Sequence, residues 1–208
     1  MEFQNEESKR HGGGDTINRA QFAGSIGAVD GTYCVQPAVG RASLAAHGSD
    51  PLLDLMWSEY KRCHAYKLML VNSHGLEGEP KFLLWVDYSC GSASDSAVYG
   101  KFCAAFREQL VPGVVLLGDH AFHGAINVIA PYTTAQVNTA IGANRAGFNK
   151  NHSSDRMTSE HGVRSLKLWG IARGREDSFL FQNDANFGLA LKAVWALHNY
   201  IASCCPVF

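Results

Sequence analysis

The sequence lacks the features that mark membrane and secreted proteins. No apolar run approaches the 18 residues that a membrane-spanning helix needs. The first residues, MEFQNEESKRHGGGD, are polar and contain no apolar segment of the kind found in secretory signals. We therefore expect an intracellular protein, in the nucleus or the cytoplasm, that makes no contact with a membrane.

Cysteine motifs and a strong net charge are also missing. None of the six cysteines forms a C-x-x-C pair, and Cys204 and Cys205 are adjacent, which excludes the usual zinc spacing and a disulfide scaffold. We expect reduced, mostly buried thiols. The net charge is −1 and only 18% of residues are charged. Composition alone therefore excludes strongly basic arms and acidic tails, and it does not indicate a nucleic-acid binder.

The apolar content is high enough for one folded domain. Hydrophobic residues make up 46% of the 208 residues, too many for a disordered chain. The 21 glycines are about one residue in ten, against a usual share of about 7%. We expect a polar N-terminal lead-in over residues 1–24 and a single domain over residues 25–208.

Hydrophobic periodicity predicts a mixed α/β sheet. Strands are predicted at 25–35, 64–71, 81–87, 114–119 and 125–130, helices at 96–110, 153–172 and 185–203, and a short helix or loop near 52–60. Asp95 is predicted to cap the helix that follows it. The order of elements indicates three antiparallel strands followed by parallel strands, flanked by helices.

Two acids stand at strand positions where a carboxylate is costly. Asp30 interrupts the apolar strand in AVDGT, and Asp119 directly follows the buried run VVLLG. Such an acid must be paired, hydrogen-bonded or bound to a metal. Ligands also collect at the carboxyl ends of strands in open α/β sheets. For Asp119, a turn residue or a helix cap is the alternative.

A third acid lies on a predicted helix. Glu160 has Arg156 and Arg164 four residues away on either side, which places all three on one helix face. A solvated row of charges is the simpler interpretation. However, His161 and Gly162 are poor helix formers, so something other than helix propensity fixes this sequence.

Three acids without matching buried bases would repel one another and have raised pKa values. Mg²⁺ or Mn²⁺ ions remove that repulsion because they prefer hard oxygen ligands. Two such ions, about 4 Å apart, activate water and stabilise the leaving oxygen in phosphodiester cleavage.

Five segments occur in a familiar order: IGAVDGT, GSASDSAVYGKF, VVLLGDHAF…IAPY, FNKNHSSDRMTSEHGVRSLKLWGI and WALHNYI. From Ile26 to Ile201 the chain resembles the nuclease domain of PIF/Harbinger-type DDE transposases, a family that includes the harbinger transposase-derived nucleases. The resemblance implies an RNase H-like fold and a metal-dependent DNA endonuclease. On matching positions, it makes Asp30, Asp119 and Glu160 the catalytic acids and the ligands of two Mg²⁺ or Mn²⁺ ions.

The resemblance also bears on DNA contact. Asn149 and Arg156 match an Asn and an Arg that precede the family's Glu, with a role in loop ordering or in contact with the DNA backbone. Arg164 and Lys167 follow on the same predicted helix. Residues 145–175 hold seven basic and two acidic side chains, a local charge of +5, whereas the remaining residues carry −6. This stretch suits a phosphate backbone, although a solvated helix face would have the same composition.

Some residues depart from the family pattern or compete with the three acids. Asp87 and Asp95 are rival metal ligands, and Asp95 also matches the family's recurrent Asp-Ser. Tyr33 stands where many members have His. His120 and His123 follow the second acid, where the family commonly has Gly and an aromatic residue. An unrelated metal hydrolase that uses Asp119 with these two histidines is therefore an alternative.

Full-length members of this family carry an upstream helix-turn-helix region. Because only 29 residues precede Asp30, we expect a truncated, transposon-derived copy that lacks this region. A separate DNA-binding protein would then supply target recognition, and an oligomer is possible. The competing hypothesis is a catalytically decayed or domesticated protein that keeps the fold and only binds DNA or a partner.

Overall fold

The computed structural model describes residues 22, 24–36, 51–74, 81–106, 113–139, 142–173 and 184–205. Apart from residues 22 and 24, the predicted lead-in lies outside these residues, as does the end of the predicted helix at 107–110. Arg175, counted above in the basic stretch, lies outside them as well.

Six strands form one mixed sheet: β1 (Ser25–Val35), β2 (Trp57–Ser58), β3 (Cys63–Ser73), β4 (Leu83–Cys90), β5 (Val115–Leu117) and β6 (Val128–Ile129). The long strand β3 pairs antiparallel with β1 and with β4. On the other side of β1, β5 runs parallel to it, and β6 runs parallel to β5. The predicted α/β class is confirmed, and the mixed sheet flanked by helices is compatible with an RNase H-like fold.

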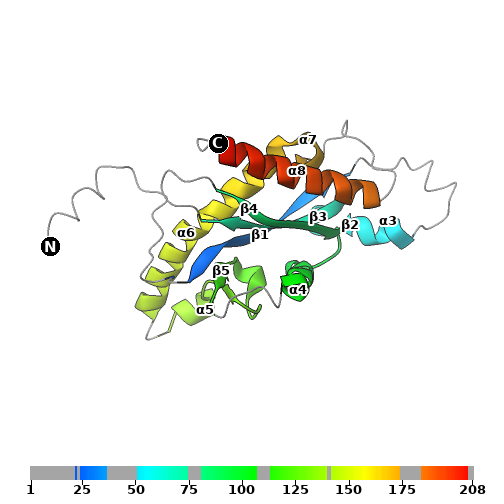
Figure 1. Ribbon diagram of the computed structural model, residues 1–208. Coiled ribbons are helices and arrows are strands. Elements are labelled where there is room, and N and C mark those ends of the chain that lie inside the picture. The colour runs from blue at the N-terminus through cyan, green and yellow to red at the C-terminus, as the bar shows by residue number, and fades with distance from the viewer. Residues whose placement is uncertain are drawn as a thin grey trace.

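The described helical segments are α3 (Pro51–Met56), α4 (Asp95–Phe106), the short 3₁₀ turn η1 (His120–Phe122), α5 (Thr134–Val137), α6 (Gly142–Leu168), α7 (Gly170–Arg173) and α8 (Asp184–Cys204). Figure 1 shows α8 and α4 on opposite sides of the sheet. Most of the predicted elements are present, with altered ends. The region near residues 52–60, for example, forms α3, then β2 and a turn.

Side chains from alternate positions of β3 point to the two faces of the sheet, as the two-residue period of a strand requires. Leu68 and Leu70 pack in one cluster with Leu166 of α6 and with Phe187 and Leu191 of α8. On the opposite face, Met69 packs in a second cluster with residues of α4, including Val98 and Phe102. Because both faces of β3 are covered, the strand is apolar almost throughout rather than alternating.

The largest difference from the predicted elements is the start of α6. The helix begins at Gly142, not near Ser153. Its first turns contain glycine, asparagine and lysine, so apolar periodicity is weak there. Tertiary contacts compensate, because Phe148 packs on a buried cluster and the ring of His152 stacks beside it.

The cap of α4 also differs from the prediction. The hydroxyl Oγ of Ser94 accepts a hydrogen bond from the backbone N–H of Ala97 at 3.2 Å, so Ser94 is the capping residue. Asp95 is the first residue of the helix. Its carboxylate is drawn away from the cap by an ion pair with Lys67, 2.9 Å from the Lys67 Nζ.

The six cysteines are free thiols, as predicted. Their expected burial is only partly correct, because Cys34 alone is fully buried, while Cys204 and Cys205 are exposed at the end of α8. In the part of the chain that the structure describes, no helix has the length and apolar character needed to cross a membrane.

Candidate active site

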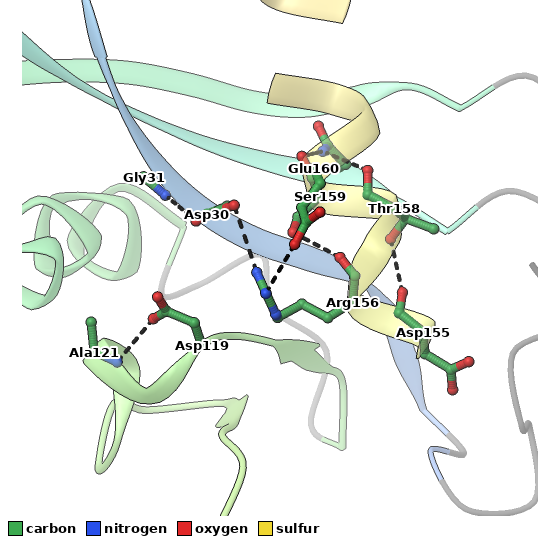
Figure 2. Close-up of polar contacts among 10 residues, drawn as sticks. Asp30, Gly31, Asp119, Ala121, Asp155, Arg156, Thr158, Ser159 and Glu160 are labelled. Atoms are coloured by element: carbon green, nitrogen blue, oxygen red, sulfur yellow. Dashed lines mark hydrogen bonds and ion pairs between the residues drawn. The ribbon is translucent and has the colours of Figure 1, made fainter. Parts of the chain in front are cut away.

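Asp30 lies in the middle of β1, opposite Leu70 of β3. The backbone N–H of Gly31 donates a hydrogen bond to Asp30 Oδ1 at 2.8 Å. The other oxygen, Oδ2, faces Arg156 of α6 (Figure 2). Only 19% of the Asp30 side chain is exposed. A strand position surrounded by buried residues therefore presents an acid to the helix that covers it.

Asp119 reaches the same region from β5. Ala28 of β1 is in register with Leu117 of the parallel strand β5, and Asp30 and Asp119 each lie two residues further along the chain. Asp119 Oδ1 accepts a hydrogen bond from the Ala121 backbone N–H at 2.9 Å, which caps η1. The alternative that Asp119 caps a helix is thus confirmed for the short turn η1. It does not conflict with a second role for the carboxylate.

Arg156 connects the acid on β1 with the acid on α6. Its Nη1 lies 3.7 Å from Asp30 Oδ2, and its Nη2 donates to Glu160 Oε1 at 3.2 Å. The guanidinium therefore stands between two carboxylates that are far apart in sequence (Figure 2). Glu160 is the more accessible of the two, with 58% of its side chain exposed.

The pKa of Asp30 is affected by its burial and by the charged groups around it. The pKa of the Asp30 carboxyl is raised to about 6, mainly by burial; Arg156 and the Gly31 N–H lower this pKa, and the charges of Asp119 and Asp95 raise it. The dependence on Asp119 indicates that the two acids sense each other's charge. A buried acid with a raised pKa beside other acids is a common feature of functional sites.

Asp95 and Lys67 support the Asp30 strand from the opposite face of the sheet. Lys67 is a buried residue of β3, and its ammonium pairs with Asp95 and lies 3.3 Å from the Tyr33 hydroxyl. Asp95 sits so close to β1 that a Cβ at Gly31 would overlap its Oδ1. The Asp-Gly sequence at the site is therefore explained by two facts: the acid faces α6, and the glycine makes room for Asp95.

Asn72 of β3 fixes the position of α6 on the sheet next to Glu160. Its Nδ2 donates to the backbone carbonyls of Thr158 and Ser159, the two residues that precede Glu160. A Cβ at Gly162 would overlap the Asn72 side chain. The unusual Gly162 was the signal in the sequence for this contact, but its partner on β3 could not be identified without the fold.

The predicted DNA-contact residues differ in their surroundings. Asn149 holds the backbone of Tyr132 with both of its amide atoms, at 2.8 and 2.9 Å, which fits loop ordering. Arg156 is engaged with the two acids. Arg164 is exposed on α6. Burial and the nearby charge of Lys61 lower the pKa of Lys167, while Cys34 raises it.

The rival residues Asp87, His120 and His123 have other surroundings. Asp87 accepts a hydrogen bond from the Tyr88 N–H and lines a cavity of about 370 Å³ with Ser89 and Lys101, which Asp30, Asp119 and Glu160 do not line. His120 and His123 are exposed, with ring centroids 5.8 Å apart.

The donor chemistry of the three acids fits a hard divalent cation, since carboxylate oxygens are the preferred ligands of Mg²⁺ and Mn²⁺. The raised pKa of Asp30, caused in part by Asp119, also fits, because a cation between the two acids would relieve their repulsion. Among the described residues, however, no group of three or more His, Cys, Asp or Glu side chains is arranged to hold a metal ion. This applies equally to the three acids and to Asp119 with the two histidines.

A comparison with protein families gives a match over most of the chain. The sequence model of a family described as DDE superfamily endonuclease matches residues 48–199. Asp119 and Glu160 lie inside the matched region, whereas Asp30 precedes it. Comparisons with curated proteins and with solved structures gave no match.

Proposed function

The chain belongs to the DDE superfamily endonucleases, and from this we propose that it is a metal-dependent DNA nuclease of the PIF/Harbinger type, built on an RNase H-like fold. We assign the catalytic acids and metal ligands to Asp30, Asp119 and Glu160. The substrate that the family implies is DNA. A nuclear location and a separate DNA-binding protein that selects the target belong to the same proposal.

The observation that carries this assignment is the shared guanidinium of Arg156, which contacts acids from β1 and from α6. The electrostatic dependence of Asp30 on Asp119 supports the inclusion of the acid that follows β5. All three acids come from elements packed side by side, and each retains oxygens for a further ligand.

In the proposed mechanism, Asp30, Asp119 and Glu160 would hold one or two Mg²⁺ or Mn²⁺ ions. When bound, these ions supply Lewis-acid activation of water and charge stabilisation at the leaving oxygen. Arg156 favours the ionised form of Asp30 and so opposes the effect of burial, because a neighbouring cation stabilises the carboxylate. It also orients the exposed Glu160 side chain toward Asp30. Asn72 and the Lys67–Asp95 pair hold α6 and β1 in place around these groups.

The test is cleavage of supercoiled plasmid DNA in Mg²⁺ or Mn²⁺ by the wild type and by Asp30→Asn, Asp119→Asn and Glu160→Gln. These substitutions keep the shape of the side chain and remove its charge. Loss of a partner behind a metal ligand lowers activity by about 10- to 100-fold, so loss of a ligand should lower it by more than about 100-fold. The control is Asp87→Asn at the β4 cavity, which should cleave at the wild-type rate. Equal cleavage by all five proteins would exclude the assignment.

One observation favours the alternative of a binding protein without catalysis: in the described residues the acids do not form a group of three metal ligands. Titration calorimetry with Mn²⁺ separates the two functions. The nuclease proposal requires Mn²⁺ binding that is lost in Asp30→Ala. DNA binding without any Mn²⁺ binding would favour the alternative.

A further inference from the structure

The turn between β2 and β3, residues 59–62, carries a cluster of exposed side chains at one end of the sheet. Tyr60 is 81% exposed, more than any other large hydrophobic residue that the structure describes. Lys61 and Arg62 follow it and are also exposed, as is Glu59 before it. The Lys61 Nζ lies 4.9 Å from the centroid of the Tyr60 ring. The Tyr60 ring is thus exposed to solvent with one cation beside it, and a second cation follows in the turn.

The turn is held in a defined conformation by the buried residue Ser58. The Ser58 carbonyl accepts from the Arg62 N–H at 2.7 Å, and the Ser58 Oγ accepts from the Lys61 N–H at 3.3 Å. Arg62 has a φ of 52°, in the left-handed region that glycine occupies at the lowest cost. Because residues held in costly backbone conformations cluster at functional sites, the Arg62 side chain is a candidate for ligand contact.

Tyr60 packs on Tyr33 of β1, on the face of the sheet opposite to Asp30. The two rings stack with centroids 6.4 Å apart and an angle of 27° between their planes. Tyr33 lies three residues after Asp30 on β1, and the Lys67 ammonium is 5.0 Å from its ring centroid. The stack therefore starts beside the Lys67–Asp95 pair and ends at an exposed ring.

Lys167 of α6 lies between Glu160 and this turn. Lys167 lies two helical turns beyond Glu160 on α6, which places it on the same side of the helix, about 10 Å further along. Burial is the main cause of the lowered pKa of Lys167, and the nearby charge of Lys61 lowers this pKa further, so the two ammonium groups lie near each other.

We propose that the 59–62 turn is a binding site for the DNA strand that leads to the active site, with Tyr60 stacking on an unpaired base and Lys61 and Arg62 contacting phosphates. Tyr60 is 81% exposed, so its ring can stack on an unpaired base once the mobile Lys61 side chain turns toward a phosphate, and the two cations favour a polyanion. The position of this strand relative to Asp30 rests on the function proposed above.

The test is DNA binding by the full chain in EDTA, which prevents cleavage. The probes are a fluorescein-labelled 20-nucleotide single strand of mixed sequence and its blunt duplex, followed by fluorescence anisotropy. Stacking on an aromatic ring is strong enough that Tyr60→Ala should weaken single-strand binding at least about fivefold. Tyr60→Trp should retain binding, and duplex binding should change less than about twofold. The control is Tyr200→Ala, which removes a tyrosine that is 67% exposed on α8.

Arg62→Gly separates binding from folding. Glycine suits the left-handed backbone, so the variant should unfold at the same denaturant concentration as the wild type or a higher one. Single-strand binding should nevertheless weaken. The slope of log K against log salt should become less negative by about 0.7, the value expected for one lost phosphate contact on a single strand.

Wild-type single-strand affinity in both Tyr60→Ala and Arg62→Gly would overturn this inference, as would a failure of the wild type to bind either probe. Plasmid cleavage that is lost in Asp30→Asn, combined with unchanged binding by Tyr60→Ala, would refute the turn site and leave the nuclease proposal intact. Tyr60-dependent binding without any cleavage would refute the nuclease proposal and leave the turn site intact.

Discussion

At the scale of single residues, Asp30 shows a conflict between stability and the proposed chemistry. Its folded pKa is about 6, against an ordinary value of 3.8, with burial as the main cause. The folded state therefore binds this proton more tightly than the unfolded state. Ionisation of Asp30 costs stability as the pH rises from about 4 to 6, and the cost remains above pH 7, where it reaches about 3 kcal/mol.

Asp30→Asn should therefore be more stable than the wild type at pH 8 in EDTA, by up to about 3 kcal/mol. This figure already includes the favourable effect of Arg156 on the carboxylate, because that effect is one of the causes of the net pKa. The difference in free energy of unfolding between the two proteins should shrink as the pH falls to 4.5. Urea unfolding at both pH values measures it. A difference that is constant across this range would contradict the raised pKa.

The sequence contained enough information to select Asp30, Asp119 and Glu160 as candidates, because each acid stands out from its immediate neighbours. The pairing of Arg156 with Glu160 also followed from helical spacing, and the structure confirms it. The pairing of Arg156 with Asp30 could not be predicted, since it depends on how α6 lies across β1. Asp95 was misassigned as a cap for the same reason: its partner Lys67 lies on a distant strand.

At the scale of elements, α6 determines where Glu160 lies, and two of its glycines have different surroundings. A Cβ at Gly162 would overlap the Asn72 side chain, whereas a Cβ at Gly147 would meet no atom within 4 Å. Helix propensity alone favours alanine at both positions by about 1 kcal/mol. Packing should reverse this preference at Gly162 only.

Gly162→Ala should therefore destabilise the protein by about 1 to 3 kcal/mol, and it should lower DNA cleavage because it moves α6 away from β3. Gly147→Ala, the matched control, should stabilise the protein by about 0.5 to 1 kcal/mol and leave cleavage unchanged. Denaturant unfolding and plasmid cleavage measure the two effects. Equal stability changes at both glycines would show that Asn72 does not fix the helix.

The Lys67–Asp95 pair joins α4 to β3 and β1, and it distinguishes a supporting role for Asp95 from a role as a metal ligand. Asp95→Ala should cost about 2 to 4 kcal/mol of stability, because it leaves the buried Lys67 without this partner. The double variant Lys67→Met, Asp95→Leu should recover much of that loss. It should also cleave DNA, and a complete loss of cleavage in a folded double variant would instead make Asp95 a ligand.

At the scale of the whole molecule, the alternation of apolar segments was sufficient to predict the mixed sheet. β1, β3 and β4 appear near their predicted positions because each is a long apolar run bounded by polar residues. The beginning of α6 could not be predicted in this way, because contacts with Phe148 and His152 stabilise a polar segment as helix. Sequence periodicity detects burial on one element, whereas these contacts involve segments that are distant in the chain.

The net charge of −1 is the sum of a basic segment, residues 145–175, and an acidic remainder, and the proposed function depends on the basic segment. Arg164 is exposed four residues after Glu160, on the helix that carries the acid. If a duplex lies along α6, Arg164→Ala should weaken its binding and make the slope of log K against log salt less negative by about 0.9, one phosphate contact. Lys192→Ala, which removes an exposed cation from α8, should change neither quantity. Anisotropy titrations with a blunt duplex in EDTA, from about 50 to 200 mM salt, distinguish the surface of α6 from that of α8. Equal effects of the two substitutions would mean that DNA binds without preference for α6, the helix of Glu160.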